Sequence, residues 1–281
     1  MGTLTTPVQN STVTTGAYVT HMDTAGTDDG HPLLLLHGTG PGASGQGAFE
    51  PLLGRLSAHR CLVPDLLGFA DSSHPEDIGS GAGPWLRARV DAVRALLDAL
   101  AIERTHLLGH SYGARVVLEL LRLEPERFGR VVLVAAGGTP VPADTSQLTD
   151  FYADPTEERM RAMITGQLAA GSAPPSDDHV RRRLALALRP DVRRSFAAAM
   201  APGEPAPVHD AAALSAVDHD VLAVHGRRDT VIPYAASLFL AEHAPRCDLH
   251  VFAHAGHQVQ LEMPDALASV VSRFLAAGDP A

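Results

Sequence analysis

Lysine is absent from this sequence, so arginine supplies all 22 of its fixed cationic side chains. Aspartate and glutamate together number 32, which gives a formal net charge of −10 at pH 7. Nucleic-acid backbones bind to clustered cations, and therefore this charge balance argues against a nucleic-acid partner. The missing lysine also excludes a Walker-type phosphate-binding loop, which needs that side chain.

Long apolar runs and cysteines are also scarce. No apolar stretch approaches the roughly 20 residues that a membrane-spanning helix requires. Residues 1–10 show no basic region followed by an apolar segment, the pattern of a secretory signal. We therefore expect a cytoplasmic protein without a membrane partner. Of the two cysteines, Cys61 begins a predicted strand and Cys247 lies near the start of another, which favours buried thiols over a disulfide framework.

Short apolar runs alternate along the chain with segments of helical spacing. The apolar runs cover residues 32–37, 61–65, 105–109, 131–135, 221–225 and 249–253, and the helical segments cover 48–58, 86–100, 114–123, 234–243 and 264–276. Most of the runs are continuous, as in strands that are buried on both faces. Together with a strand pair within residues 11–22, this order predicts an α/β fold with a mostly parallel sheet of about eight strands flanked by helices.

One segment interrupts this alternation. Residues 139–216 are rich in proline, glycine and alanine and contain short amphipathic pieces without a buried-strand pattern. We expect this segment to be a helical cap inserted into a core domain formed by residues 1–138 and 217–281. A chain of 281 residues is long enough for one such domain with an insertion.

A serine stands between two glycines at a predicted strand-to-helix turn. The pentapeptide at 109–113 reads Gly-His-Ser-Tyr-Gly, which is the pattern of a nucleophile elbow. Such a turn exposes the serine hydroxyl, and the N–H groups at the start of the following helix can bind an oxyanion. We predict Ser111 as the nucleophile and the Tyr112 N–H as an oxyanion donor. From the pentapeptide alone, an ordinary loop serine remains the alternative.

An acid and a histidine are needed to activate a serine, in the chain order serine, acid, histidine. Asp229 lies just past the predicted strand at 221–225, and His257 lies just past the one at 249–253. The carboxyl ends of parallel strands meet at one edge of a sheet, and therefore both side chains are expected to reach Ser111. This position separates His257 from the rest of the 15 histidines in the chain.

The glycine-rich loop at residues 37–42 follows the first long strand and is the candidate for the second oxyanion donor. Thr39 or Gly40 would supply the N–H group. The loop lacks the spacing of a dinucleotide fingerprint, so phosphate binding is disfavoured.

With these residues in place, the sequence resembles the α/β-hydrolase superfamily over nearly its full length. Within it, the chain most closely resembles the meta-cleavage product hydrolases, carbon–carbon bond hydrolases of the 2-hydroxymuconic semialdehyde type. The segments that carry the resemblance are His37–Gly42, Pro64–Phe69 with Ser72, the elbow, Pro125–Arg127 with Val131–Leu133, His225–Asp229 with Ile232 and Pro233, and Leu249–Phe252 with Gly256 and His257. The resemblance implies a small-molecule substrate, no metal or organic cofactor, and a homodimer or higher homo-oligomer.

The resemblance also points to substrate-binding residues in the cap. Arg183 matches the cap-helix arginine that binds the substrate's dienoate carboxylate, a task suited to bidentate guanidinium geometry. The alternative places Arg181, Arg182 and Arg183 on a solvated helix face. The residues expected to line the pocket roof, with packing inside the cap as the alternative, are Phe151, Tyr152, Met160, Met163 and Phe196.

Two positions depart from the family pattern. His110 stands where these hydrolases usually carry asparagine, and Gln258 replaces the tryptophan that usually follows the catalytic histidine. Both lie beside the predicted chemistry and are candidates for substrate contact. Because many esterases and lactonases have a histidine before the nucleophile, two hydrolytic functions stay open. One is cleavage of a carbon–carbon bond beside a carbonyl in a small dienoate or diketone-like substrate, and the other is carboxylic ester or lactone hydrolysis. The intact triad disfavours a third class, a non-catalytic binder or a cofactor-free oxygenase.

Overall fold

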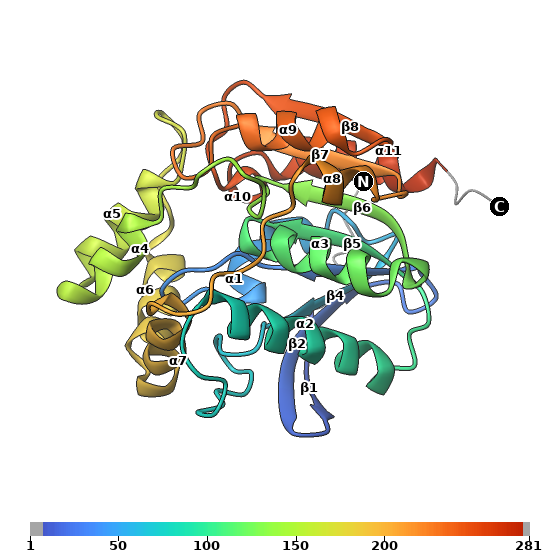
Figure 1. Ribbon diagram of the computed structural model, residues 1–281. Coiled ribbons are helices and arrows are strands. Elements are labelled where there is room, and N and C mark those ends of the chain that lie inside the picture. The colour runs from blue at the N-terminus through green and yellow to red at the C-terminus, as the bar shows by residue number, and fades with distance from the viewer. Residues whose placement is uncertain (1–7, 278–281) are drawn as a thin grey trace.

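The computed structural model describes residues 8–277, which build a sheet with helices on both faces (Figure 1). Residues 1–7 and 278–281, which include most of the segment inspected for a secretory signal and both ends of the predicted core domain, lie outside the described residues. The strands are β1 (Gln9–Thr15), β2 (Tyr18–Gly26), β3 (Pro32–Leu36), β4 (Arg60–Pro64), β5 (Thr105–His110), β6 (Phe128–Val134), β7 (Val221–Gly226) and β8 (Cys247–Phe252).

The eight strands lie in the order β1-β2-β4-β3-β5-β6-β7-β8. β2 pairs antiparallel with both β1 and β4, and every other pair in the sheet is parallel. The prediction of a mostly parallel sheet of about eight strands is confirmed, and so is the entry pair formed by β1 and β2. The parallel arrangement brings the carboxyl ends of β3, β5, β7 and β8 to one edge, where the candidate residues follow.

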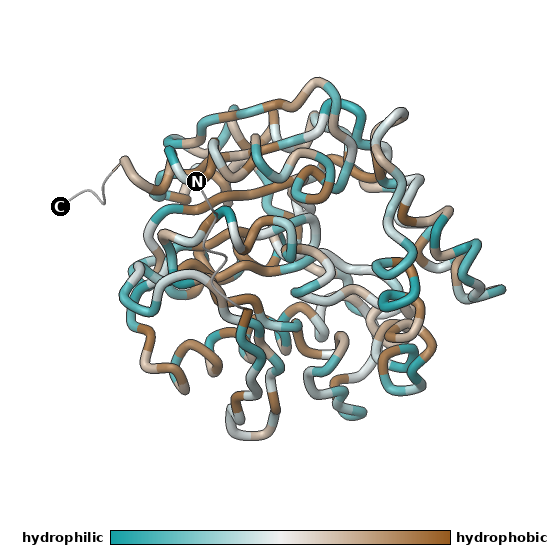
Figure 2. Tube along the Cα trace, turned by 180° about the vertical axis from the view of Figure 1, so that it is seen from behind, coloured by the Kyte–Doolittle hydropathy of each residue, from teal (hydrophilic) through white to brown (hydrophobic). Residues whose placement is uncertain are grey.

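The strands carry continuous apolar runs because both faces of the sheet are covered. In β3, Leu34 and Leu36 belong to one apolar core, whereas Leu33 and Leu35 point into the other. Alternate side chains of a strand face opposite sides, so a strand between two helical layers needs apolar residues at every position. The hydropathy-coloured trace shows this central apolar layer (Figure 2).

Helices cover each face of the sheet. Those around the core strands are α1 (Gly45–Leu53), α2 (Ala82–Ala99), α3 (Tyr112–Leu123), α9 (Ala235–His243), α10 (Val259–Glu262) and α11 (Pro264–Ala276), with the short 3-10 turn η1 (Pro125–Arg127). Side chains of α2, α3 and α9 belong to one apolar core, and those of α1 and α11 belong to the other. α1 begins earlier than its predicted segment because Ser44 accepts a hydrogen bond from the Gly47 N–H and caps the helix.

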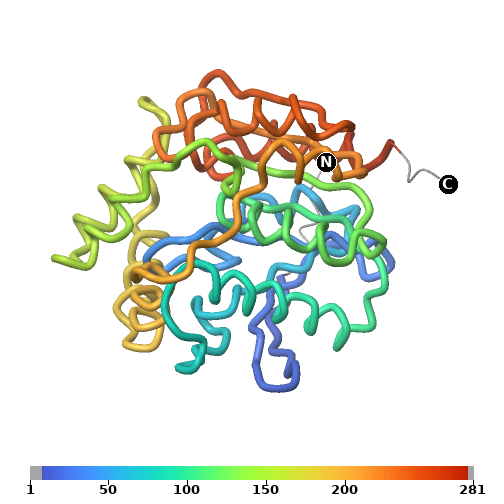
Figure 3. The backbone as a smooth tube through the Cα atoms, in the orientation of Figure 1, coloured from blue at the N-terminus to red at the C-terminus, as the bar shows by residue number. Residues whose placement is uncertain are grey.

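Between β6 and β7 the chain forms helices and loops and no strand in any described residue of 139–216. These helices are α4 (Ser146–Asp150), η2 (Phe151–Ala153), α5 (Glu157–Gly166), α6 (Asp177–Leu188), α7 (Pro190–Met200) and α8 (Ala211–Ser215). Side-chain oxygens of Thr156 and Ser176 cap α5 and α6. The yellow part of the trace extends from the sheet and the orange part returns to it (Figure 3). That residues 139–216 form a separate cap domain stays a prediction.

No helix among residues 8–277 is long and apolar enough to span a bilayer. Cys61 is buried in β4 and Cys247 is partly exposed at the start of β8, and both thiols are free. Burial raises the pKa of the Cys61 thiol to about 12, so this group stays protonated near neutral pH.

Candidate active site

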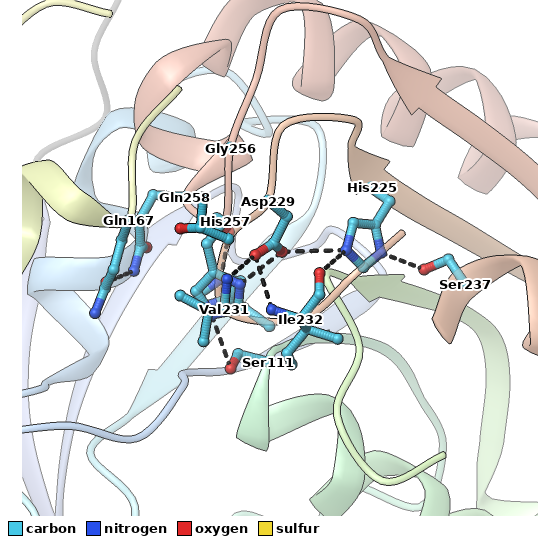
Figure 4. Close-up of polar contacts among 12 residues, drawn as sticks. Ser111, Gln167, His225, Asp229, Val231, Ile232, Ser237, Gly256, His257 and Gln258 are labelled. Atoms are coloured by element: carbon cyan, nitrogen blue, oxygen red, sulfur yellow. Dashed lines mark hydrogen bonds and ion pairs between the residues drawn. The ribbon is translucent and has the colours of Figure 1, made fainter. Parts of the chain in front are cut away.

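Three loops at the carboxyl ends of β5, β7 and β8 bring Ser111, Asp229 and His257 together (Figure 4). Nε2 of His257 lies 3.0 Å from Oγ of Ser111, and Nδ1 of the same ring lies 2.8 Å from Oδ2 of Asp229. Both separations are hydrogen-bonding distances. The three residues therefore have the geometry of a charge-stabilised serine, histidine and acid triad.

The elbow holds Ser111 in a strained backbone conformation. Its φ of 54° and ψ of −114° fall in a region that residues with a side chain rarely adopt. The turn is possible because Gly113 carries no side chain: a Cβ there would lie 2.0 Å from the carbonyl oxygen of Leu36. A Cβ on Gly109 would likewise lie 2.7 Å from the backbone of Ala114. Gly109 thus lets α3 turn back closely on β5, and Gly113 lets the start of α3 lie against the end of β3, which together present the serine hydroxyl.

The carboxylate of Asp229 is fully enclosed, with its side chain 0% exposed. Oδ1 accepts hydrogen bonds from the N–H groups of Val231 and Ile232, at 2.8 and 2.9 Å. Burial by itself raises the pKa of Asp229, but hydrogen bonds from His225 and His257 outweigh it and hold the pKa well below its usual range. An ionised Asp229 requires a proton on Nδ1 of His257. The Nε2 atom is then free to accept the proton of Ser111.

His225 supports Asp229 from behind, and sequence reasoning did not identify it as a functional residue. Its Nε2 lies 3.1 Å from Oδ2 of Asp229 and 2.9 Å from the carbonyl oxygen of Ile232, and its Nδ1 lies 2.7 Å from Oγ of Ser237. Both neighbours of Nε2, a carboxylate oxygen and a backbone carbonyl oxygen, can only accept a hydrogen bond. The ring proton of His225 therefore lies on Nε2, and Nδ1 accepts a hydrogen bond from the Ser237 hydroxyl. The signal for this role was its position on β7, directly before the loop that carries the acid.

The lowered pKa of Asp229 predicts a specific pH dependence of stability. A carboxyl whose folded pKa lies below its ordinary value of 3.8 stabilises the native state above that value, and this contribution is lost as the pH falls toward the folded pKa. We expect the free energy of unfolding of wild-type protein to fall by about 1 kcal/mol more than that of Asp229→Asn between about pH 5 and pH 3. Urea unfolding at the two pH values measures this difference, and equal losses in both proteins would contradict it.

Backbone donors lie on two sides of Ser111. The N–H of Tyr112 belongs to the first turn of α3, where N–H groups have no acceptor within the helix. Of the two candidates in the glycine-rich loop, Thr39 lines the cavity that contains Ser111, whereas Gly40 lies against the guanidinium of Arg183. His37 braces this loop, since its Nδ1 lies 2.7 Å from the carbonyl oxygen of Gly38 and its Nε2 accepts from the Leu66 N–H.

Ser111 opens into a cavity of about 350 Å³ between the sheet edge and the helices of residues 139–216. The cavity wall includes Arg183 of α6 as well as His257. Nε of Arg183 donates to the carbonyl oxygen of Pro41 at 3.0 Å, and in residues 8–277 no carboxylate forms an ion pair with this arginine. Burial lowers the pKa of Arg183 to about 10, which leaves the side chain charged near neutral pH. The cavity therefore contains a cation available to an anionic ligand.

The sequence left two interpretations of the three consecutive arginines of α6, a solvated helix face and a carboxylate-binding site, and each applies to part of the set. Arg181 and Arg182 are exposed and pair with acidic residues of the same helix, Asp177 and Asp178 respectively. Arg182 and Arg183 both line the cavity, but Arg182 is paired with Glu50 and Asp178, whereas Arg183 has no carboxylate partner in residues 8–277. Neighbouring positions of a helix point about 100° apart, so one helix can present cations both to solvent and to a pocket.

The prediction that Phe151 and Phe196 contact substrate needs correction. Both pack inside the helical segment and are absent from the cavity wall, and the same holds for Tyr152, Met160 and Met163. The short helices of this segment can bury their apolar faces only against one another, and these large side chains fill that interior. The cavity is lined instead by smaller apolar side chains, among them Leu148, Leu186, Val231, Ile232 and Leu261.

The two departures from the family pattern both line the cavity. Burial and the neighbouring His257 ring lower the pKa of His110 to about 3, so its imidazole is neutral near pH 7. Its Nε2 donates to the backbone carbonyl of His257 at 3.0 Å, which leaves Nδ1 without a proton. The amide of Gln258 donates to Oε1 of Gln167 at 2.6 Å and accepts from Gln260 at 2.8 Å. The position that tryptophan usually fills in the family thus holds a glutamine whose side chain is hydrogen-bonded to two other buried glutamine side chains.

One other cluster has the composition of a cation site. Ligand atoms of His21, Asp65 and Asp71 lie within 4.8 Å of one another. The Asp65 carboxylate already accepts hydrogen bonds from the His21 ring at 2.8 Å and from the Gly45 N–H at 2.7 Å. These bonds tie β2 and the start of α1 to the loop after β4.

Comparison with known proteins agrees with this geometry. Residues 31–264 match a family model described as the alpha/beta hydrolase fold. The chain is 34% identical over 261 residues to a 2-hydroxymuconate semialdehyde hydrolase of a Pseudomonas species, covering 90% of this chain and 89% of the relative. It is also similar to the solved structure of a 2-hydroxy-6-oxo-6-phenylhexa-2,4-dienoate hydrolase of a Rhodococcus species, with a TM-score of 0.88, 31% identity and coverage of 97% of this chain and 100% of that one. A serine hydrolase of Cycloclasticus zankles has a TM-score of 0.89 at 33% identity, covering 96% and 98%.

Proposed function

This chain belongs to the α/β-hydrolase family and, within it, to the meta-cleavage product hydrolases, and on that premise we propose that it cleaves a carbon–carbon bond beside a carbonyl in a small dienoate acid. The relatives named above are called hydrolases of 2-hydroxymuconate semialdehyde and of a phenyl-substituted dienoate. Both names describe an acid whose chain carries a carbonyl group, and the substrate of this enzyme belongs to the same class.

One observation carries the proposal: a charged arginine, which no carboxylate within residues 8–277 pairs with, shares a cavity with a serine, histidine and acid triad. The guanidinium of Arg183 binds the substrate carboxylate and so orients the chain toward Ser111. A neutral ester has no carboxylate for such a cation to bind, whereas a dienoate acid has one. The same charge stabilises the electron-rich dienol fragment as the carbon–carbon bond breaks.

Each residue of the triad and each oxyanion donor has its own role in the proposed reaction. His257 takes the proton of Ser111, and the serine oxygen adds to the substrate carbonyl while Asp229 stabilises the imidazolium. The N–H groups of Tyr112 and Thr39 hold the oxyanion. The carbon–carbon bond then breaks, its electron pair enters the dienol fragment, and the imidazolium of His257 gives its proton to that fragment, which leaves as the first product. Water, deprotonated by His257, hydrolyses the acyl group from Ser111.

Purified protein assayed on a ring-cleavage dienoate beside short aryl esters tests the proposal. We expect kcat/KM to be at least about a hundredfold higher for the dienoate, because only this substrate uses Arg183. Turnover of the esters with none of the dienoate would instead identify an ester or lactone hydrolase. No turnover of either, together with no labelling of Ser111 by a fluorophosphonate, would exclude a serine hydrolase.

We also infer the neighbouring contacts of the substrate. His110 and Gln258 flank Ser111 and His257 on the cavity wall and contact the polar end of the bound acid. A cytoplasmic location and a homo-oligomeric state remain predictions from the sequence and its resemblance.

A further inference from the structure

A short segment at the end of α5 crosses both loops that carry the acid and the histidine. We call residues 166–172 the cap strap. The hydroxyl of Thr230, next to Asp229, donates to the carbonyl oxygen of Gly166 at 2.9 Å. The backbone N–H of His257 donates to the carbonyl oxygen of Gln167 at 2.8 Å. The cap strap is thus bonded to the backbone of the catalytic histidine itself.

One carboxylate joins the cap strap to the turn that precedes His257. Oε2 of Glu262 accepts from the Ala169 N–H at 2.7 Å and from the Ser172 hydroxyl at 2.6 Å. Oε1 of the same group accepts from the Gly256 N–H at 2.8 Å. All three distances lie at or near the short end of the hydrogen-bonding range, so this carboxyl group joins the three donors closely. Glu262 lies in α10, directly after the histidine loop.

The cap strap and the turn are also packed without space between them. A Cβ on Gly256 would lie 2.7 Å from both the Ala169 nitrogen and the Gln167 carbonyl oxygen. This contact, together with the three bonds of Glu262, leaves the turn no room to move while the cap strap stays in place. His257 follows Gly256 directly, so the position of its ring depends on the same contacts.

We propose that Glu262 is a positioning residue for the reaction, which holds the cap strap against the Gly256 turn and thereby keeps Nε2 of His257 within reach of Ser111. The inference rests on the proposed role of the triad. It makes the helical segment part of the catalytic framework at this end.

Loss of the carboxylate leaves three donors without their acceptor. The Ser172 hydroxyl can turn toward water, but the N–H groups of Ala169 and Gly256 are fixed by the backbone and lose their partner. The turn and the cap strap then separate to admit water, and the imidazole moves with them. A displacement of about 1 Å at a catalytic group can cost about a hundredfold in rate.

Glu262→Ala and Glu262→Gln, compared with wild-type protein, test this role. We expect Glu262→Ala to lower kcat about tenfold or more with KM changed by less than about twofold, because Arg183, which binds the substrate carboxylate, is untouched. The rate of Ser111 labelling by a fluorophosphonate should fall in parallel, since it needs only the serine and the histidine. Glu262→Gln keeps one carbonyl acceptor and should recover part of both rates.

Asp265→Ala is the matched control, because this carboxylate lies nearby at the start of α11 but is exposed and bonded only to Arg55 among the described residues. It should leave kcat and labelling unchanged. Turnover is divided by the fraction of molecules that the probe labels at completion, which removes any effect of unfolded protein. Unchanged normalised kcat and labelling rate in Glu262→Ala would overturn the proposal, as would a change in KM alone. If Glu262→Ala does not fold, the rate of Ser111 labelling in Glu262→Gln is compared with that of wild-type protein instead, and an unchanged rate would overturn the proposal. Wild-type protein that is neither labelled nor active would instead overturn the proposed function.

Discussion

Ser111→Ala is expected to lower turnover by about a thousandfold or more while the protein stays folded. The variant loses the atom that attacks the carbonyl but keeps the methyl-sized Cβ that the elbow already accommodates. Within the described part of the chain, the side chain of Ser111 forms one hydrogen bond, to His257, so little native structure depends on it. Steady-state kinetics on the dienoate and circular dichroism together measure the two parts of this prediction.

His257→Ala is expected to cost a similar factor, because serine and histidine act as a unit. The double variant should then be about as slow as either single one. His254→Ala is the matched control: it lies in the same loop but is exposed and makes no bond to the triad. If Ser111→Ala retained turnover within about tenfold of wild type, direct attack by water would replace the serine adduct as the mechanism.

Arg183→Ala is expected to lower kcat/KM for the dienoate acid by about a hundredfold, which corresponds to about 2.7 kcal/mol. The substrate carboxylate would enter a cavity whose remaining arginine, Arg182, is already paired with Glu50 and Asp178. Neutral aryl esters should react at nearly the wild-type rate, because they do not use this contact. Kinetics with an acidic and a neutral substrate on the same preparation give the comparison.

Two further variants show whether the loss in Arg183→Ala comes from the charge and shape of the guanidinium or from a general disturbance of α6. Arg181→Ala removes an exposed cation from the same helix and should change neither substrate's kinetics. Arg183→Lys keeps the charge but loses the planar fork, and it should lie between alanine and wild type. An equal loss for acidic and neutral substrates in Arg183→Ala would show that the arginine maintains the cavity and does not bind a carboxylate.

The elbow and the sheet were predictable because each depends on local pattern. Two glycines around a serine, between an apolar run and a helical segment, allow few other structures, and continuous apolar runs require a sheet covered on both faces. The positions of Asp229 and His257 followed from topology, since residues after parallel strands meet at one edge.

The cavity wall was not predictable in the same way. Phe151 and Phe196 have the character of pocket residues, yet they fill the interior of the helical segment, while the smaller Leu186 and Leu261 line the pocket. Arg183 and Gln258 line it as well, and the sequence had singled these two out only through the family resemblance and the departures from it. A residue's type shows that it is buried but does not show what it is buried against. His225 and Glu262 escaped notice for a related reason, because their roles depend on partners that are distant along the chain or belong to the backbone.

The sequence by itself determined the order of strands and helices, the strained serine and the chain order of acid and base, because these follow from backbone sterics and hydrophobic periodicity. Only the tertiary structure decided which cation faces the nucleophile and which carboxylate holds the catalytic histidine in place. Those features depend on how the helices of residues 139–216 pack against the sheet edge. That packing follows from the shapes of many side chains together, and no local pattern encodes it.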